Sequence, residues 1–313
     1  MPDYIVAVRN VRKHAFGAEP GPTRFLKVPG NQRPKPEHAQ RRADWVDDVL
    51  ALGRTGRDPH SGEDCGEIVV LVHGYNTSPA AVAGRHRQLK NNLAASGFRC
   101  ALVSFDWPSD DRAINYLEDR SDAKLTALRL VDDCITLLAA TQFRGCKYNV
   151  HVIAHSMGSY VVREAFDDAD DRPAIAANNW TVSQMCLVGA DVSRRSMSAT
   201  DARSRSLYRH CTRLTNYQNP YDRILKLSNV KRAGVLPRAG RRGLPPDHPD
   251  KAVNVDCGSH FAAHYGDSGD DGHSWYFEDA VFLADLVATL QGDRDRRVIA
   301  ARRLDDLAEL HLR

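Results

Sequence analysis

The sequence contains no apolar run long enough to cross a bilayer, which takes about 20 consecutive apolar residues in a helix. Its first residues also lack a basic stretch followed by a long apolar one, so we expect no signal peptide. A strong excess of one charge is absent too, because 43 Lys and Arg stand against 40 Asp and Glu. The resulting net charge of +3 does not favour nucleic acid or a membrane surface as the main partner.

The sequence shows no pattern of paired cysteines. The seven cysteines are scattered, odd in number and form no Cys-x-x-Cys pair: Cys65, Cys100, Cys134, Cys146, Cys186, Cys211 and Cys257. Several lie in apolar segments, where a thiol acts as a small hydrophobic side chain. This usage is typical of reduced thiols, so we expect a cytoplasmic protein.

The size and apolar content of the chain predict a single domain over residues 1–313. Hydrophobic residues make up 42% of the chain, which is enough for one sizeable core. Within the domain we expect an N-terminal extension with two short strands and a helix (1–66), a core that carries the chemistry (67–292), and a C-terminal helix (293–313).

Apolar runs alternate with helical patterns throughout the core region. The strongest run is Ile68 to Val72, whose continuous β-branched and apolar residues are typical of a strand buried on both faces. Further strands are expected at 100–105, 150–153, 185–188, 214–217 and 252–255, and helices at 79–95, 121–141, 156–166 and 275–290. This alternation predicts an α/β fold with a mostly parallel sheet, helices on both faces and only a minimal cap.

Ser156 lies where a predicted strand meets a predicted helix, between the small residues Ala154 and Gly158. A serine becomes a nucleophile when a base can take its proton and its Oγ is held clear of the backbone. A sharp strand-to-helix turn achieves this and requires small residues two positions before and after the serine. Such turns usually have glycine at the first of these positions, so Ala154 departs from the pattern by one methyl group. We predict that Ser156 is the nucleophile.

Backbone N–H donors for an oxyanion are predicted at two places. One is Met157, which follows the nucleophile at a helix N-terminus, and the other is Tyr75, in the loop after an earlier strand. In that loop His73 and Gly74 precede Tyr75, and Gly74 allows the chain to turn closely. His155, beside the nucleophile, is expected to shape the turn or an acyl pocket rather than act as the base.

The acid and the base should follow the nucleophile in the order Ser, Asp or Glu, His. Asp222 and Asp191 each follow a predicted strand, and the later position favours Asp222; Asp191 is the competitor, or a carboxylate that stabilises a loop near the site. His273 precedes the predicted helix at 275–290, where a short loop can return an imidazole to the sheet edge. We predict His273 as the base.

Two other histidines, His260 and His264, are spaced four residues apart, which would suit a metal on a helix. The glutamate of a His-Glu-x-x-His motif is absent, and Gly258 and Gly266 favour a loop. We expect solvated histidines, no metal and no cofactor.

Several of these segments together resemble a family of bacterial α/β-hydrolases that was long catalogued as a domain of unknown function and is described as esterase- or lipase-like. The matching segments are Val72-His73-Gly74-Tyr75-Asn76, Phe105-Asp106-Trp107-Pro108-Ser109, Ala154-His155-Ser156-Met157-Gly158, Tyr217 to Ser228, Arg232-Ala233-Gly234 and Gly272-His273-Ser274. The resemblance covers roughly residues 68–290. It implies an α/β-hydrolase fold and the triad Ser156, Asp222 and His273.

These observations predict a carboxylic ester hydrolase that acts on a small-molecule ester through an acyl-enzyme. Lipase, thioesterase or peptidase chemistry would use the same groups, and a non-catalytic binding protein on this fold is the alternative from another class. The basic segment 231–242 follows Asp222 closely, so it should lie near the site. It is either a solvated loop or a feature that favours anionic acyl substrates.

Overall fold

The computed structural model describes residues 1–109, 124–140, 147–167, 169–176, 180–230, 236–266, 268–269, 271–306 and 309–313. Its strands are β1 Asp3–Arg12, β2 Ala15–Val28, β3 Ala39–Gln40, β4 Arg54–Arg57, β5 Asp64–Val72, β6 Ala101–Asp106, β7 Lys147–His155, β8 Val182–Val188, β9 Cys211–Gln218, β10 Ala252–Asp256, β11 Arg302–Leu304 and β12 Leu310–Leu312.

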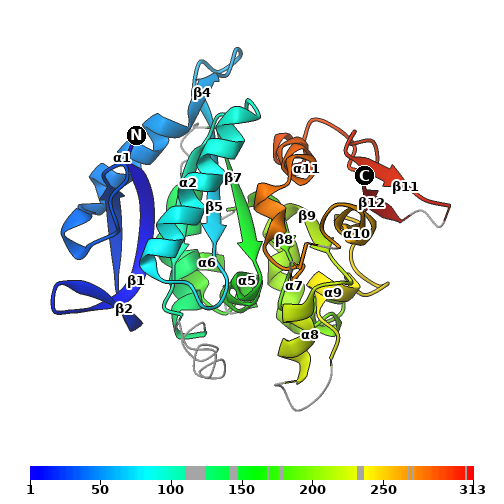
Figure 1. Ribbon diagram of the computed structural model, residues 1–313. Helices are drawn as coiled ribbons and strands as arrows, with labels where there is room; N and C mark the ends of the chain where they lie inside the picture. The colour runs from blue at the N-terminus through cyan, green and yellow to red at the C-terminus, as the bar shows by residue number, and fades with distance from the viewer. Residues whose placement is uncertain are drawn as a thin grey trace.

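The helices lie between and around these strands (Figure 1). They are η1 Pro36–His38, α1 Arg42–Gly53, α2 Pro79–Ala95, η2 Val131–Ile135, α4 Thr136–Ala139, α5 Met157–Asp167, α6 Pro173–Ala176, η4 Arg195–Met197, α7 Ala202–Arg209, α8 Arg223–Val230, α9 Ala239–Arg242, α10 Gly258–Tyr265, η5 Trp275–Glu278 and α11 Ala280–Gln291. The helix predicted at 121–141 is helical over 124–140, with a π-helical turn in η2, and its predicted ends lie outside the described residues.

The described strands form one sheet in the order β11-β12-β10-β9-β8-β7-β5-β6-β1-β2-β3, with β4 beside β5. The central strands from β1 to β10 pair in parallel, and β12 continues the parallel arrangement beyond β10. Antiparallel pairs occur at the two edges and at β4. The predicted mostly parallel sheet is therefore confirmed, and all six strands expected in the core region are present.

Each face of the sheet has its own apolar core. Along β5, Ile68, Val70 and Val72 belong to one cluster while Val69 and Leu71 belong to the other, because successive side chains of a strand point to opposite faces. Helices α1, α4, α5 and α7 bury residues in the first cluster, and α2, α10 and α11 in the second. Figure 1 shows α2 and α11 in front of the strands. Helices therefore cover both faces, as predicted.

The N-terminal strands are longer than predicted and belong to the central sheet. β1 runs for ten residues and β2 for fourteen, and β1 pairs in parallel with β6 from Tyr4 to Ala7. Lys13 and His14 join them with positive φ angles of 49° and 63°. Such tight hairpin turns favour Asn and Gly, so this turn left no clear signal in the sequence.

The predicted C-terminal helix at 293–313 is wrong. This segment forms the hairpin β11–β12, and β12 pairs with β10. Val298 and Leu304, which would lie on the apolar face of such a helix, are exposed. Leu310 and Leu312 are buried on either side of His311 with the period of a strand. Arg302 is buried in an ion pair with Asp285 of α11, which anchors the hairpin.

The loop predicted around 258–266 is also wrong, since residues Gly258–Tyr265 form helix α10. Gly258 is needed for close packing, because a Cβ there would lie 2.7 Å from Pro220 Cγ. His260 is buried rather than solvated, and its Nε2 lies 2.8 Å from Asp279 Oδ2. His264 is exposed, as expected.

The helix predicted at 275–290 is present but begins as the 3₁₀ turn η5 and restarts as α11. Asp279 separates the two and accepts a hydrogen bond from the N–H of Phe282 at 2.7 Å, which caps α11. Gly292 ends α11 in the left-handed conformation, with a φ of 69°. No helix among the described residues is both long and apolar enough to span a membrane, and each of the six described cysteines is free.

Candidate active site

Ser156 occupies a sharp turn between β7 and α5, with a φ angle of +55°. Positive φ is uncommon for a residue with a side chain. Two backbone hydrogen bonds of 3.0 Å hold the turn: Ser156 N–H donates to Val188 O, and Asp191 N–H donates to Ser156 O. At Gly158 a Cβ would lie 2.4 Å from Val72 O, so only glycine fits there. Ala154 lies within β7 and is fully buried.

Ser156, His273 and Asp222 form one hydrogen-bonded chain. His273 Nε2 lies 2.8 Å from Ser156 Oγ, and His273 Nδ1 lies 2.7 Å from Asp222 Oδ2. The other carboxylate oxygen of Asp222 accepts the N–H of Leu225 at 2.8 Å, so Asp222 also caps helix α8. All three side chains are buried, with exposures of 6% for Ser156, 7% for His273 and 0% for Asp222. The structure thus brings together the three residues predicted as nucleophile, acid and base.

The loops that carry His273 and Asp222 are joined to each other. Asn219 Nδ2 donates to Gly272 O at 2.9 Å, and Arg223 N–H donates to Asp271 O at 2.8 Å. Gly272 has a φ of 77°, and a Cβ there would lie 2.9 Å from Asn219 Nδ2, so the position requires glycine. These contacts set His273 beside Asp222 before any substrate binds.

Asp191, the competing acid, has a different partner. Its Oδ1 lies 3.1 Å from Arg238 Nε, and both side chains are almost fully buried. Its backbone N–H, as noted, supports the Ser156 turn. Asp191 is therefore a buried carboxylate that stabilises the neighbourhood of Ser156.

Electrostatics separate His273 from the two other imidazoles nearby. Burial lowers the pKa of His73 and lowers the pKa of His155 well below its usual value, so both rings are neutral. Burial also acts on His273, but the Asp222 carboxylate outweighs it and raises the pKa of His273 above that of an ordinary histidine. Burial raises the pKa of Asp222. Of the three imidazoles, only His273 both gains affinity for a proton and contacts Ser156.

His155 packs against His273. Its Nε2 lies 2.9 Å from His273 O, and the two rings are 4.9 Å apart between centroids. Because a carbonyl accepts, Nε2 of His155 carries the proton, and Nδ1 accepts from Arg85 Nη1 at 3.4 Å. His155 therefore lies beside the base, and its predicted role in shaping the turn or an acyl pocket stays a prediction.

The loop after β5 packs directly on the serine. A Cβ at Gly74 would lie 2.8 Å from Ser156 Cβ, so Gly74 permits the contact. His73 stacks on Trp107 at 5.4 Å, and the Trp107 indole donates to His73 O at 2.9 Å. Tyr75 is half-buried and packs against the core, and Met157 is fully buried at the start of α5.

A buried network from β1 holds this loop, and sequence reasoning missed its main member. Arg9 Nε lies 2.7 Å from Asp106 Oδ1, and Arg9 Nη2 donates to Thr77 O at 2.7 Å. Thr77 Oγ1 in turn donates to Gly74 O and Tyr75 O, both at 3.1 Å. Arg9 lies in an ordinary strand and is 97 positions away from Asp106 in the sequence, so its neighbours in the chain do not indicate that it is buried or paired.

The basic segment predicted near the site is described from residue 236 onward, and residues 231–235 lie outside the described residues. Arg241 Nε donates to Asp222 O at 3.3 Å, which places this part of the segment beside the acid. Arg242 instead lines a separate cavity of about 580 Å³ beside β10 and β12.

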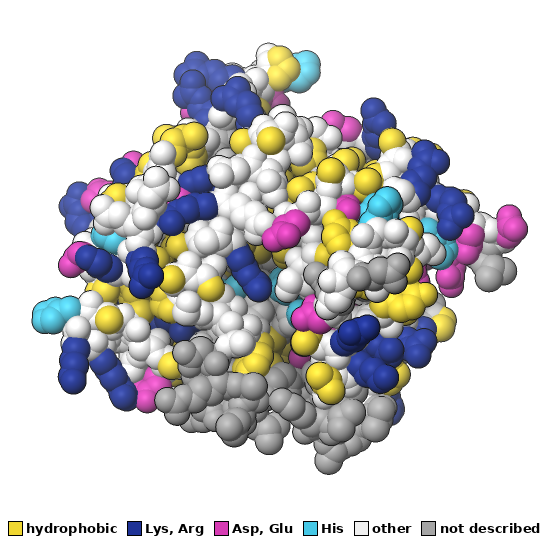
Figure 2. Space-filling view, viewed as in Figure 1, with side chains coloured by type: hydrophobic (Ala, Val, Ile, Leu, Met, Phe, Trp, Pro, Cys, Tyr) yellow, Lys and Arg dark blue, Asp and Glu magenta, His cyan; other side chains and the backbone are white. Residues whose placement is uncertain are grey.

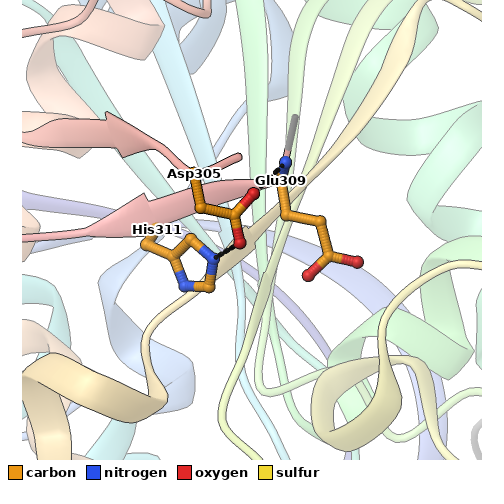
Figure 3. Close-up of side chains that lie close together, drawn as sticks. All are labelled: Asp305, Glu309 and His311. Carbon is orange, nitrogen blue, oxygen red and sulfur yellow. Dashed lines mark hydrogen bonds and ion pairs between the residues drawn. The ribbon is translucent and has the colours of Figure 1, made fainter. Parts of the chain in front are cut away.

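Among the described residues, one group of side chains has the composition of a metal site: Asp305, Glu309 and His311, whose potential ligand atoms lie within 4.8 Å of one another. The group belongs to the β11–β12 hairpin, several strands away from Ser156. His311 Nε2 lies 2.9 Å from Asp305 Oδ2, and Asp305 Oδ1 accepts the N–H of Glu309 at 2.8 Å. Figure 3 shows the Glu309 carboxylate pointing away from this pair. The hydrogen bonding of the hairpin accounts for the arrangement.

A serine on a strand-to-helix turn, followed in the chain by an aspartate and a histidine from later loops, is an arrangement typical of α/β-hydrolases. The chain belongs to the family described as alpha/beta hydrolases of unknown function (DUF900), whose match covers residues 58–242. That range includes Gly74, Ser156 and Asp222 and ends before His273.

A relative, the uncharacterized protein alr1448 of Nostoc sp., is 27% identical over 119 residues, which cover 32% of this chain and 30% of that protein. Solved structures with some likeness include a Trichoderma reesei cutinase in complex with a phosphonate inhibitor (15% identity, 79% of this chain and 84% of that chain, TM-score 0.33). Another is esterase B from Lactobacillus rhamnosis (10% identity, 72% and 75% coverage, TM-score 0.37). At these scores the structural likenesses carry no argument about activity.

Proposed function

We propose that this protein is a serine hydrolase that cleaves carboxylic esters through an acyl-enzyme intermediate. The observation that carries the proposal is the hydrogen-bonded chain from Ser156 Oγ through His273 to Asp222, with distances of 2.8 and 2.7 Å. These lie within the reach that proton transfer requires, and the serine projects from a turn of positive φ.

In the first half-reaction His273 Nε2 accepts the Ser156 proton as Oγ attacks the acyl carbon. The tetrahedral intermediate collapses, the bond to the alkoxy group breaks, and His273 returns the proton to the departing alcohol. In the second half-reaction water attacks the acyl group, gives its proton to His273, and releases the acid as Ser156 recovers its own proton. Asp222 holds Nδ1–H of the imidazole and stabilises the imidazolium without itself taking the proton.

The oxyanion that forms in each half-reaction needs two N–H donors, and we assign them to Tyr75 and Met157. The contact of Gly74 with Ser156 supports this assignment, since it brings the loop next to the nucleophile. Losing one such donor typically costs about 3 kcal/mol of transition-state stabilisation, so a substitution that displaces this loop should lower kcat by roughly 100-fold.

The proposal is tested by rapid-mixing kinetics with 4-nitrophenyl acetate and butyrate. Acyl-enzyme formation predicts a burst of one nitrophenolate per chain before the steady rate, and no burst in Ser156→Ala. The control is Ser159→Ala, one turn further along α5, which should retain the burst. A Ser156→Ala protein that still shows the burst contradicts the assignment, and a folded wild-type protein that turns over neither ester favours a binding protein on the hydrolase fold.

A further inference from the structure

Arg85 of α2 is a half-buried cation that has no counter-ion among the described residues. In the part of the chain that the structure describes, its guanidinium makes a single polar contact, to Nδ1 of the neutral His155 at 3.4 Å. Burial lowers the pKa of Arg85. On the same side of the site, Glu278 accepts a hydrogen bond from Gln88 instead.

This arrangement is unlike that of the other deeply placed arginines. Arg9, Arg238 and Arg302 each lie against a buried aspartate, as expected for charges removed from water. A guanidinium carries five N–H donors in a planar fork, so most donors of Arg85 have no protein partner among the described residues. An unpaired, partly desolvated cation is unfavourable in the free protein and is typical of a group that meets its partner in a ligand.

The position of Arg85 ties it to the candidate active site. It contacts His155, which packs on His273 at 4.9 Å between ring centroids. With His73, His155 and Phe277 it also lines a small cavity of about 10 Å³, room for about one water molecule. Figure 2 shows histidine, basic and acidic side chains near the centre of this face. A planar anion bound at Arg85 would therefore lie beside His155, whose ring packs on that of His273.

We propose that Arg85 is a substrate-binding residue that selects esters carrying a second, free carboxylate, and that this carboxylate forms a two-point contact with the Arg85 guanidinium. The inference rests on the proposed function, since it concerns the substrate of the same site. The guanidinium matches a carboxylate in geometry and charge, and the low polarity around it strengthens the contact. Monoesters of short dicarboxylic acids are the simplest substrates of this class.

The test compares two esters of equal chain length, 4-nitrophenyl hydrogen glutarate and 4-nitrophenyl pentanoate. Arg85→Gln should lower kcat/KM for the glutarate roughly 10- to 100-fold, the worth of a charge-assisted hydrogen bond, and leave the pentanoate within about twofold. Arg85→Lys should recover part of the preference. Arg99→Gln is the matched control. It removes the same charge from an exposed site just before β6, at the amino-terminal end of that strand, whereas Ser156 follows the carboxyl end of β7, and it should change neither value.

An equal loss for both esters would make Arg85 a positioning residue for His155 and overturn the inference while leaving the proposed function intact. The preference for the glutarate over the pentanoate could instead be lost in the double variant Arg241→Glu, Arg242→Glu and kept in Arg85→Gln. That result would assign substrate selection to the basic segment and would also overturn the inference about Arg85. A readout independent of turnover is calorimetric binding of glutarate to Ser156→Ala, with and without Arg85→Gln. We expect glutarate to bind about tenfold more weakly to the protein that carries both Ser156→Ala and Arg85→Gln than to Ser156→Ala alone. Equal binding, or none to Ser156→Ala, contradicts the inference even if no ester is cleaved.

Discussion

Replacing Arg9 by methionine should destabilise the protein more than any other change to β1. Arg9 is 2% exposed and Asp106 0%, so the substitution leaves a carboxylate buried without its cation. Removing one partner of a buried ion pair typically costs about 3–5 kcal/mol, a large part of a domain's usual 5–15 kcal/mol. The measurement is urea unfolding followed by tryptophan fluorescence.

The same strand supplies a control. Arg12 pairs with Glu19 on the surface, with side-chain exposures of 69% and 58%, so Arg12→Met should cost less than about 1 kcal/mol. The double variant Arg9→Met, Asp106→Leu should lose less stability than the sum of the two single variants, since it leaves no buried charge behind. Strictly additive losses, or an Arg9→Met protein as stable as Arg12→Met, would refute the reasoning.

The loss should also depend on pH. Burial acts to raise the pKa of Asp106, but the Arg9 guanidinium outweighs it and lowers that pKa in the folded protein. The wild-type carboxylate therefore adds stability above the usual aspartate pKa of about 3.9 and loses it as the pH falls. In Arg9→Met, burial prevails and raises the pKa of Asp106, so its charged carboxylate lowers the stability of the variant. The difference in the free energy of unfolding between the wild type and Arg9→Met should therefore narrow as the pH falls towards 4. A difference that does not change with pH would contradict a charged Asp106 carboxylate in the wild type.

Three further predictions concern the site. Because the Asp222 carboxylate raises the pKa of His273, kcat/KM should fall with decreasing pH through a midpoint above 6.5. Asp222→Asn should move that midpoint to lower pH, which full pH profiles of both proteins will measure. Asp222→Asn should also lower kcat on the order of 10⁴-fold, whereas Asp191→Asn should act mainly on stability; the reverse order in steady-state assays would make Asp191 the acid. Gly74→Ala should lower kcat without unfolding the protein, since its Cβ would lie 2.8 Å from Ser156 Cβ, and unchanged burst amplitude and rate would argue against that contact.

The core of the fold could be predicted because its signals are local. Continuous apolar runs such as Ile68 to Val72 indicate strands buried on both faces, and Ser78, Pro79 and Gly292 mark helix ends by their backbone chemistry. The errors arose where tertiary packing outweighs pattern. The β11–β12 segment resembled a thin helical stripe, yet it is held by pairing with β10 and by the buried Arg302–Asp285 pair. Gly258 suggested a loop, yet it is the first residue of helix α10, where the absence of a side chain lets the helix pack against Pro220.

The candidate site divides in the same way. Ser156 and Gly158 could be found because the turn restricts which residues fit, and chain order indicated Asp222 and His273. Arg9 could not be found, because its partners Asp106 and Thr77 are distant in sequence and only the pairing of β1 with β6 brings them together. The lack of a carboxylate partner for Arg85 among the described residues is likewise a property of the folded surroundings.

The most direct test of the central claim is covalent labelling with a fluorophosphonate, followed by mass spectrometry of the digested protein. The account predicts one adduct per chain on the peptide that contains Ser156, and loss of labelling in Ser156→Ala with retention in Ser159→Ala. Labelling should also drop sharply in His273→Ala, since the base that activates Oγ is gone. An adduct on another residue, or labelling that persists in Ser156→Ala, would contradict the claim that Ser156 is the nucleophile.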